Sequence, residues 1–353
     1  MMKDKGKQIE RQAEDAIRFC LKDVPFCRVE FRDNPRGVAD NGIDLIGSLI
    51  TNAGKRPLVV EVKPNGQPRW ARNAANALAL YRTKNPSAYG ILVAPYITEE
   101  AGRIAAENGI GYVDLAGNCR IAFDQVYIRR EGRENKFTRK RDLRSLFSPK
   151  AERVLRMLLL EPKRGWKVEE LAKVADVSLG QASNVKKLLD DREWLRRGER
   201  GLELIDPKKL LTEWSQNFDP SRSRSSDLFS LDPIGKIESK IADACKRLGV
   251  RYALTGFSGA ARLAPAVRYQ RASVYIAEKL DEVATAVGLR PVTSGANVSV
   301  IEPYDDGVFA GTRKIGGADV ASPVQVFLDL SAIPGRGEEA ADALLREVIE
   351  PSW

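Results

Sequence analysis

The sequence predicts an α/β protein of several domains, and three observations support this fold class. Val- and Leu-rich stretches alternate with amphipathic helical segments over residues 1–140. Three short helical segments and a strand hairpin follow over residues 147–215. Strand and helix signals alternate again over residues 231–353, after a Ser- and Arg-rich connector at residues 219–226. A chain of 353 residues that is 43% hydrophobic can bury the cores of about two to three domains.

Charged residues in a predicted hairpin are the strongest functional signal. Residues 42–50 and 56–63 are predicted strands joined by a turn that contains Asn and Gly. Antiparallel pairing of these strands would place Asp44 near Glu61. Alternate residues of a strand face the same side, so Glu61 and Lys63 are expected to project together. The sequence therefore predicts that two carboxylates and one ammonium converge at a sheet edge.

This arrangement is typical of a metal site. Two neighbouring carboxylates repel each other unless they are neutralised, and Mg²⁺ with oxygen ligands does this well. The motifs Gly42-Ile43-Asp44 and Glu61-Val62-Lys63 resemble the PD-(D/E)xK nuclease superfamily, whose fold is restriction-endonuclease-like. The resemblance extends over about residues 7–130. It implies that Asp44 and Glu61 hold the metal and that Lys63 orients or activates the attacking water.

The same resemblance implies a further carboxylate from the first helix. Glu14 is the first candidate and Glu10 the second, and their spacing places both on one helix face. The helix predicted over residues 70–81 carries Asn73 and Asn76 where relatives often have Gln, so that accessory role is not expected. Two other interpretations stay open: the Glu and Lys form an ordinary cross-strand salt bridge, or the domain binds DNA without cleaving it.

The remainder of the first domain fits the same α/β plan. Residues 89–95 are a predicted strand, residues 98–106 a helix, and residues 110–123 two short strands about a tight turn. Asp114 precedes that turn. It is expected to accept hydrogen bonds within the turn, with a metal or phosphate contact as the alternative.

Composition favours a polyanionic partner and excludes several chemistries. Lys and Arg total 57 against 48 acidic residues, which gives a net charge of +9. Residues 129–144 contain eight basic and three acidic residues, and they either follow a phosphate backbone or form a solvated linker. The sequence contains no histidine, so a Ser-His-Asp or Cys-His catalytic unit cannot form.

The four cysteines lack Cys-x-x-Cys spacing, which argues against structural zinc and fits a reducing cytoplasm. The N-terminus has no signal-peptide pattern, and no stretch of about 18 apolar residues predicts a membrane span. We therefore expect a cytoplasmic protein without a membrane partner.

The second domain is expected to bind double-stranded DNA. Helices are predicted over residues 149–160, 167–175 and 179–190, followed by a hairpin at residues 194–205. This order, over residues 148–206, resembles a winged helix-turn-helix. The third helix and the hairpin carry polar and basic side chains suited to a major groove and the adjacent backbone. These candidate DNA-binding residues are Gln181, Ser183, Asn184, Lys186, Lys187, Arg196, Arg197 and Arg200. A winged helix used for protein contact is the alternative.

The third domain is predicted to be α/β or α+β. Helices are expected over residues 234–248 and 338–349. The predicted strands are residues 251–254, 273–277, 298–301 and 324–329. Gly256-x-Ser258 before a helix resembles the start of nucleotidyltransferase domains, in which helix N-terminal amides hold phosphates. The following strand lacks the required pair of carboxylates, so a degenerate, non-catalytic relative or an ordinary tight turn is expected.

Residues 255–265 and 301–330, together with residues 113–118, resemble the AbiEi-type antitoxin and transcriptional regulator family of bacterial type IV toxin–antitoxin systems. The resemblance is expected to cover most of the chain. It implies a winged-helix repressor of its own operon, with a nucleotidyltransferase-like toxin as partner. Two hypotheses follow: a DNA-binding regulator or antitoxin, which we favour, and a Mg²⁺-dependent endonuclease in phage defence or DNA processing.

Overall fold

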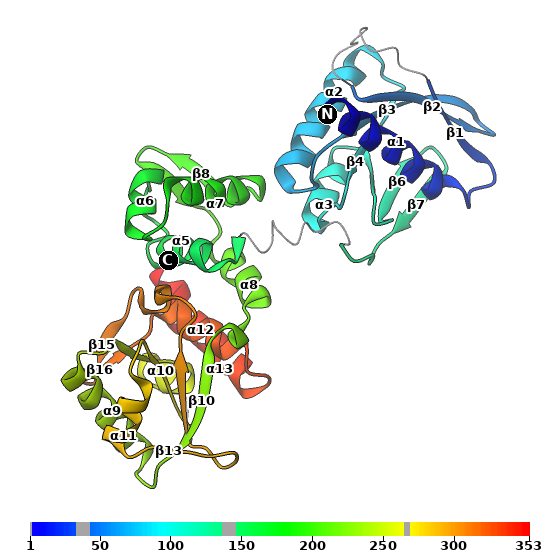
Figure 1. The fold of residues 1–353 in the computed structure, drawn as a ribbon. Helices are drawn as coiled ribbons and strands as arrows, with labels where there is room; N and C mark the ends of the chain where they lie inside the picture. Colours follow the sequence, from blue (N-terminus) through cyan, green and yellow to red (C-terminus); the bar gives the residue numbers. More distant parts are fainter. Residues whose placement is uncertain (1, 33–42, 136–145, 265–268) are drawn as a thin grey trace. The chain divides into compact units, whose positions relative to one another are not determined.

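The computed structural model describes residues 2–32, 43–135, 146–264 and 269–353. The chain divides into two compact units, of which the first is Met1–Leu143 with Leu189–Glu193. The second is Arg144–Leu188 with Trp194–Trp353. Most of the two segments expected as separate domains, residues 147–215 and 231–353, therefore falls within one compact unit (Figure 1). The chain is a mixed α/β protein, as predicted.

The first unit is built on a seven-stranded sheet whose strands follow chain order from β1 to β7. Its strands are β1 (Cys27–Phe31), β2 (Leu45–Thr51), β3 (Gly54–Val62), β4 (Tyr89–Ala94), β5 (Gly111–Asp114), β6 (Cys119–Phe123) and β7 (Val126–Arg130). The central strands β3, β4 and β5 are parallel, and the flanking pairs are antiparallel. Parallel strands need crossover connections, and α2 and α3 supply them.

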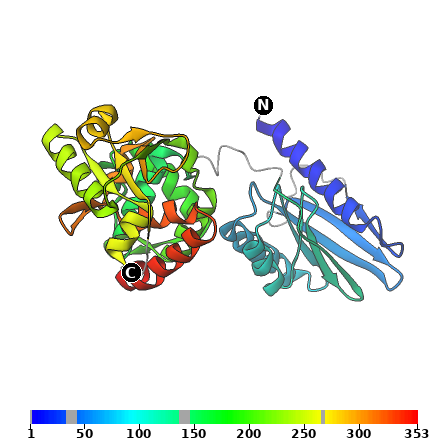
Figure 2. The ribbon, with the colours of Figure 1, turned by 90° about the horizontal axis from the view of Figure 1, so that it is seen from below.

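Helices cover both faces of this sheet. α1 (Met2–Leu21) lies on one face, and α2 (Pro68–Lys84) and α3 (Glu99–Glu107) lie on the other (Figure 2). The core under α1 includes Ile17 and Leu58, and the core under α2 and α3 includes Leu78 and Leu92. Because side chains alternate along each strand, β3 contributes to both cores.

Most of a segment that we call the helix–hairpin module, residues 148–206, belongs to the second unit. Its elements are α5 (Pro149–Leu160), α6 (Val168–Val174), α7 (Leu179–Asp191), β8 (Leu195–Gly198) and β9 (Gly201–Leu204). A backbone bridge between Trp166 and Leu202 adds a third extended segment to the hairpin. Gly201 has a φ of 135°, and a Cβ there would meet the Trp166 carbonyl oxygen at 2.4 Å. Only glycine fits at this position.

The helix α8 (Pro207–Asn217) connects the module to a second seven-stranded sheet, with strand order β13-β10-β14-β12-β11-β16-β15. The strands are β10 (Arg224–Phe229), β11 (Tyr252–Leu254), β12 (Ala272–Ile276), β13 (Arg290–Pro291), β14 (Val298–Glu302), β15 (Arg313–Ile315) and β16 (Ala318–Val320). The helices around the sheet are α9 (Ile234–Leu248), α10 (Gly256–Leu263), α11 (Leu280–Val287), α12 (Pro323–Ser331) and α13 (Arg336–Leu344). A π-helical turn, Leu345–Ile349, extends α13.

Two predicted elements differ from the structure. Residues 324–329, predicted as a strand, lie in α12, whose N-terminus is capped by the Ser322 hydroxyl accepting from the Gln325 N–H at 3.3 Å. The helix is buried almost all round, so its apolar run has no helical period to reveal it. The connector at residues 219–226 contains a 3₁₀ turn, Pro220–Arg222, and the start of β10. Among the helices of the described residues, none combines the length and the apolar character of a membrane span.

Candidate functional site

Asp44 and Glu61 are neighbours at the end of the β2–β3 hairpin. Leu45 pairs with Val60 in the antiparallel register, so Asp44, one residue before β2, lies beside Glu61. The Val62 backbone N–H donates to the Asp44 Oδ2 at 2.7 Å. This bond fixes the Asp44 carboxylate against the end of β3, as the hairpin prediction requires.

Glu61 and Lys63 project to the same side of the strand. Glu61 is 2% exposed, and its Oε2 forms an ion pair with the Lys63 Nζ. The other carboxylate oxygen, Oε1, is buried and has no hydrogen-bond partner among the described residues. Burial raises the pKa of Glu61, Lys63 opposes that shift, and Asp44 adds to it. The three groups therefore converge, while their catalytic roles stay predictions.

The donor set at this hairpin fits a hard divalent cation. The unpartnered, buried Glu61 Oε1 is an anionic oxygen that lacks a donor, and the Asp44 carboxylate is adjacent. No three His, Cys, Asp or Glu side chains gather into a metal site anywhere in the described parts of the chain. Glu14, which is partly exposed on α1, therefore does not join the other two carboxylates in such a group. Mg²⁺ commonly takes one or two protein carboxylates and completes its shell with water and substrate phosphate.

Other residues near the predicted nuclease site have structural roles or lie outside it. Asp114 is buried and accepts from the backbone N–H of Asn118 at 2.8 Å and of Ile97 at 3.2 Å. The prediction of a turn acceptor is confirmed. Asn73 and Asn76 are exposed on α2. Of the basic run at residues 129–144, residues 136–144 lie outside the described residues.

The second candidate site is the surface of α7 and the β8–β9 hairpin. Ala182, Val185 and Leu189 of α7 are buried, so the opposite face of the helix is available to a ligand. Of the predicted DNA-contacting residues, Ser183, Asn184, Lys187, Arg196, Arg197 and Arg200 are exposed, and Gln181 and Lys186 are partly exposed. The polar face predicted from helical spacing is therefore present.

The arginines of the hairpin differ in their local partners. Arg196 lies opposite Glu203 in the register, and its Nε donates to the Glu203 Oε2 at 2.8 Å. Arg197 lies opposite Leu202 and forms no ion pair with the described residues. Arg197 is therefore the more available cation, because Arg196 would have to leave Glu203 before it bound a phosphate.

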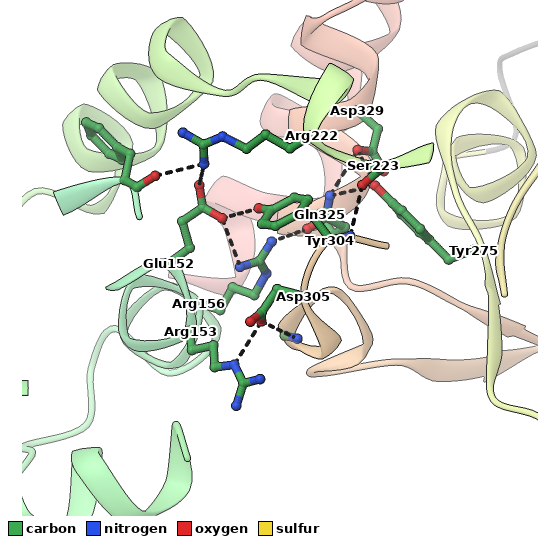
Figure 3. A network of polar contacts seen from close by, with 12 residues as sticks. Glu152, Arg153, Arg156, Arg222, Ser223, Tyr275, Tyr304, Asp305, Gln325 and Asp329 are labelled. Carbon is green, nitrogen blue, oxygen red and sulfur yellow. Dashed lines mark hydrogen bonds and ion pairs between the residues drawn. The ribbon is translucent and has the colours of Figure 1, made fainter. Parts of the chain in front are cut away.

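An arginine on α5 holds the turn before α7. The Arg153 Nη1 donates to the Asp176 Oδ2 at 2.6 Å, and its Nε donates to the Asp305 Oδ1 at 2.8 Å. Asp176 connects α6 to α7 and has a φ of 50°. Asp305 belongs to the segment after β14. The position of α7 is thus tied to the second sheet through one side chain (Figure 3).

A buried polar network continues this connection. Glu152 and Arg156 of α5 are almost fully buried. Glu152 accepts from the Tyr304 hydroxyl and from the Arg222 Nη1, the latter at 3.1 Å. The Arg156 Nη2 donates to the Gln325 Oε1 at 2.6 Å (Figure 3). Burial raises the pKa of Glu152, and the nearby cations and the Tyr304 hydroxyl oppose the shift.

The network ends at a carboxylate in α12. The Asp329 Oδ1 accepts from Tyr275 at 2.8 Å and from Gln325 at 2.9 Å, and Thr255 donates to its other oxygen. Burial raises the pKa of Asp329 to about 6. Sequence reasoning missed this network. The network has one local signal in the sequence, the charged pair Glu152 and Arg156, which stands among the regularly spaced apolar residues of α5.

The Gly256-x-Ser258 turn, expected to be degenerate or an ordinary tight turn, makes a contact within its own domain. Gly256 starts α10 with a φ of 50°, and the buried Ser258 hydroxyl accepts from the Ser273 N–H at 2.9 Å. The strand β12, Ala272–Ile276, carries no Asp or Glu, and Glu278, which follows it, is exposed. The degenerate nucleotidyltransferase relationship stays a prediction.

One protein family matches part of the chain. The family described as "Transcriptional regulator, AbiEi antitoxin, Type IV TA system" matches residues 203–350. This match covers less than half of the chain and is narrower than the sequence resemblance predicted. It includes the second sheet, and it excludes the Asp44–Glu61–Lys63 cluster and all of α5, α6 and α7.

Two solved structures share weak similarity with this chain. "Structure of EndoMS-dsDNA2 complex" aligns with 19% identity over 29% of this chain and 43% of that chain, at a TM-score of 0.22. "Crystal structure of a repair endonuclease from Pyrococcus abyssi" aligns with 19% identity over 29% of this chain and 46% of that chain, at a TM-score of 0.21. The aligned region spans less than half of each of these proteins, and the TM-scores do not establish a common fold. No curated protein matches.

Proposed function

We propose that this chain is a DNA-binding transcriptional regulator that serves as the antitoxin of a type IV toxin–antitoxin system. The match of residues 203–350 to that regulator family carries the proposal. The helix–hairpin module precedes this region, and all of the module except Leu189–Glu193 shares a compact unit with it. The module acts as a winged helix-turn-helix, with α7 in the major groove and the β8–β9 hairpin on the neighbouring phosphates. Double-stranded DNA is the ligand, and a nucleotidyltransferase-like toxin is the functional partner.

The buried network supports this function by fixing the module in place. Arg153, Glu152 and Arg156 all project from α5 and bond to residues of the segment after β14 or of α12. A recognition helix needs a defined orientation, because base-edge contacts depend on the register of the helix in the groove. The part of the chain that matches the regulator family thus serves as the platform for α7.

Salt-dependent DNA binding tests the proposal. Each phosphate contact contributes about 0.9 to the slope of log K against log salt, so Arg197→Ala should reduce its magnitude by about one unit. Arg196→Ala should reduce it less, because Glu203 already neutralises that guanidinium. Together the two substitutions should flatten the slope by about one to two units. Lys236→Ala on α9 is the matched control, since Lys236 is paired with Asp232 outside the module.

Two results would count against this function. An unchanged slope in the Arg197 variants would remove the hairpin from the DNA interface. A protein that binds no duplex DNA at low salt would rule out the regulator. The antitoxin role has its own test, in which this protein is co-expressed with a nucleotidyltransferase-like toxin from a neighbouring gene. This protein should restore the growth that the toxin arrests. Continued growth arrest would refute the antitoxin role.

A second function is favoured by the convergence of Asp44, Glu61 and Lys63. We propose as the alternative that the first unit is a Mg²⁺-dependent endonuclease of the PD-(D/E)xK type. Asp44 and Glu61 would hold the metal, which neutralises the charge that develops on the phosphate. The Lys63 ammonium would position the attacking water within reach of that phosphate. The buried, unpartnered Glu61 Oε1 is the observation that supports a cation here.

Plasmid nicking with Mg²⁺ or Mn²⁺ tests the alternative. Asp44→Asn keeps an acceptor oxygen for the Val62 N–H while it removes the charge, so it should preserve the hairpin and abolish nicking. Asp124→Asn is the control, because Asp124 is an exposed carboxylate of the same unit. A metal-dependent rise in the unfolding temperature, lost in Asp44→Asn, would report the cation directly. Nicking that survives in Asp44→Asn and Lys63→Ala would exclude this site.

A further inference from the structure

One row of residues crosses the sheet of the first unit from the carboxylates to an arginine pair. The strand registers align Glu61 of β3, Leu92 of β4, Tyr112 of β5, Arg120 of β6 and Arg129 of β7. Residues that are paired across strands face the same side of a sheet. Leu92 and Tyr112 are buried beneath α2 and α3, whereas the β6–β7 end of the row reaches the surface. Strands lie about 4.8 Å apart, which places Arg120 about 14 Å from Glu61 along the row.

The two arginines are an unfavourable pair for folding. Arg120 lies directly opposite Arg129, and directly opposed residues of an antiparallel pair have adjacent Cβ atoms. Like charges at such positions destabilise a sheet. The Arg129 Nε donates to the Glu131 Oε1 at 2.8 Å, and the Arg120 guanidinium lies 5.9 Å from the Tyr127 ring centroid.

Only one of the two charges is neutralised locally. Glu131 pairs with Arg129 and also accepts from the Tyr112 hydroxyl at 3.2 Å. Arg120 forms no ion pair with any carboxylate in the described ranges, and its guanidinium lies over the Tyr127 ring. A guanidinium has five N–H donors in a planar fork. Arg120 therefore offers donors toward solvent beside a second arginine.

An exposed aromatic residue completes this surface. Tyr127, the second residue of β7, is 63% exposed, and its position two residues before Arg129 places both on the same face. A sheet surface with only a structural role would be stabilised by a carboxylate opposite one of the arginines. The chain instead combines two guanidinium groups and a phenol, all of which donate hydrogen bonds to phosphate oxygens in protein–DNA complexes.

We propose that Arg120, Tyr127 and Arg129, which we call the β6–β7 surface, bind the phosphate backbone of duplex DNA. Arginine forks match the geometry of phosphate oxygens, and a bound phosphate would relieve the repulsion between the paired cations. The inference rests on the proposed function, because it assumes that the full chain binds DNA. It adds a second contact, in the first unit, to the contact expected from the helix–hairpin module.

The test is DNA binding by the full-length protein carrying Arg120→Gln and Arg129→Gln. Affinity for a duplex of about 30 base pairs is measured from 50 to 200 mM salt, and the slope of log K against log salt should fall in magnitude by about one to two units. Arg103→Gln is the matched control, since Arg103 is an exposed α3 cation of the same unit paired with Glu107. Its slope should equal that of the wild type. Circular dichroism and the unfolding midpoint verify that each variant is folded.

The outcomes separate this inference from the proposed function. A wild-type slope in the double variant, with a reduced slope in Arg197→Ala, would overturn the β6–β7 surface and leave the regulator intact. Equal losses in the double variant and in Arg103→Gln would show a general charge effect and would also overturn it. Absence of duplex binding by the wild-type protein would overturn the proposed function, and this inference with it.

Discussion

Asp329→Asn should change how the stability of the second unit depends on pH. The carboxylate lies at the end of the polar network, where it accepts hydrogen bonds from Thr255, Tyr275 and Gln325. Burial raises the pKa of Asp329 from its ordinary value of 3.8 to about 6, and the three donors and Arg156 limit that rise. The folded protein therefore holds this proton at a pH where the unfolded chain has released it.

The sign and the size follow from proton linkage. Between about pH 4 and pH 6 the folded state binds more protons at Asp329 than the unfolded state, so stability falls as the pH rises. The shift is about two pKa units, and each unit is worth about 1.4 kcal/mol. In the wild type, this group should therefore remove about 3 kcal/mol of unfolding free energy between pH 3.5 and pH 7. Asparagine cannot ionise, so the variant should lack this loss.

Urea unfolding followed by tryptophan fluorescence measures the effect, because Trp166 and Trp214 are buried in the second unit. The free energy of the variant minus that of the wild type should increase by about 3 kcal/mol from pH 3.5 to pH 7. Other titrating groups are common to both proteins and cancel in this difference. A difference that stays constant across this range would refute the argument that Asp329 is protonated by burial.

Two further substitutions test the energetics of the first unit. Lys63→Met should lower the unfolding free energy by about 3 kcal/mol, because it leaves the buried Glu61 carboxylate without its counter-charge. Lys55→Met, which removes a cation from an exposed pair with Glu30, should stay within about 0.5 kcal/mol of the wild type, and equal losses would contradict the first expectation. Arg120→Gln should leave urea stability unchanged or raise it by about 0.2–1 kcal/mol, because it removes one of two opposed like charges. A loss above about 1 kcal/mol would show that this arginine stabilises the sheet.

Much of the local structure was predictable from spacing and caps. The helix expected over residues 149–160 is α5, Pro149–Leu160, with Pro at its first turn. The helix expected over residues 234–248 is α9, which ends at Gly249 in the left-handed conformation. The hairpin that carries Asp44 and Glu61 also formed as expected, because alternation in two neighbouring strands and a short turn define its register.

The same reasoning failed where a segment is buried on all sides. The apolar run of α12 has no polar face, so neither a helical nor a strand period distinguishes it. Ser322 and Pro323 were local signals for a helix start, and the strand-like composition of the run outweighed them. Arg222, in a segment interpreted as a connector, reaches the buried Glu152.

The sequence by itself determined the α/β class, most element positions and the approach of Asp44, Glu61 and Lys63. These depend on periodicity, on turns and on contacts between adjacent strands, which are encoded within a few tens of residues. Only the tertiary structure decided that Arg156 meets Gln325 and that Glu152 meets Tyr304, pairs that lie 169 and 152 positions apart along the chain. Such pairs form because packing of whole sheets and helices brings distant segments together, and no local pattern specifies which distant side chain completes a contact.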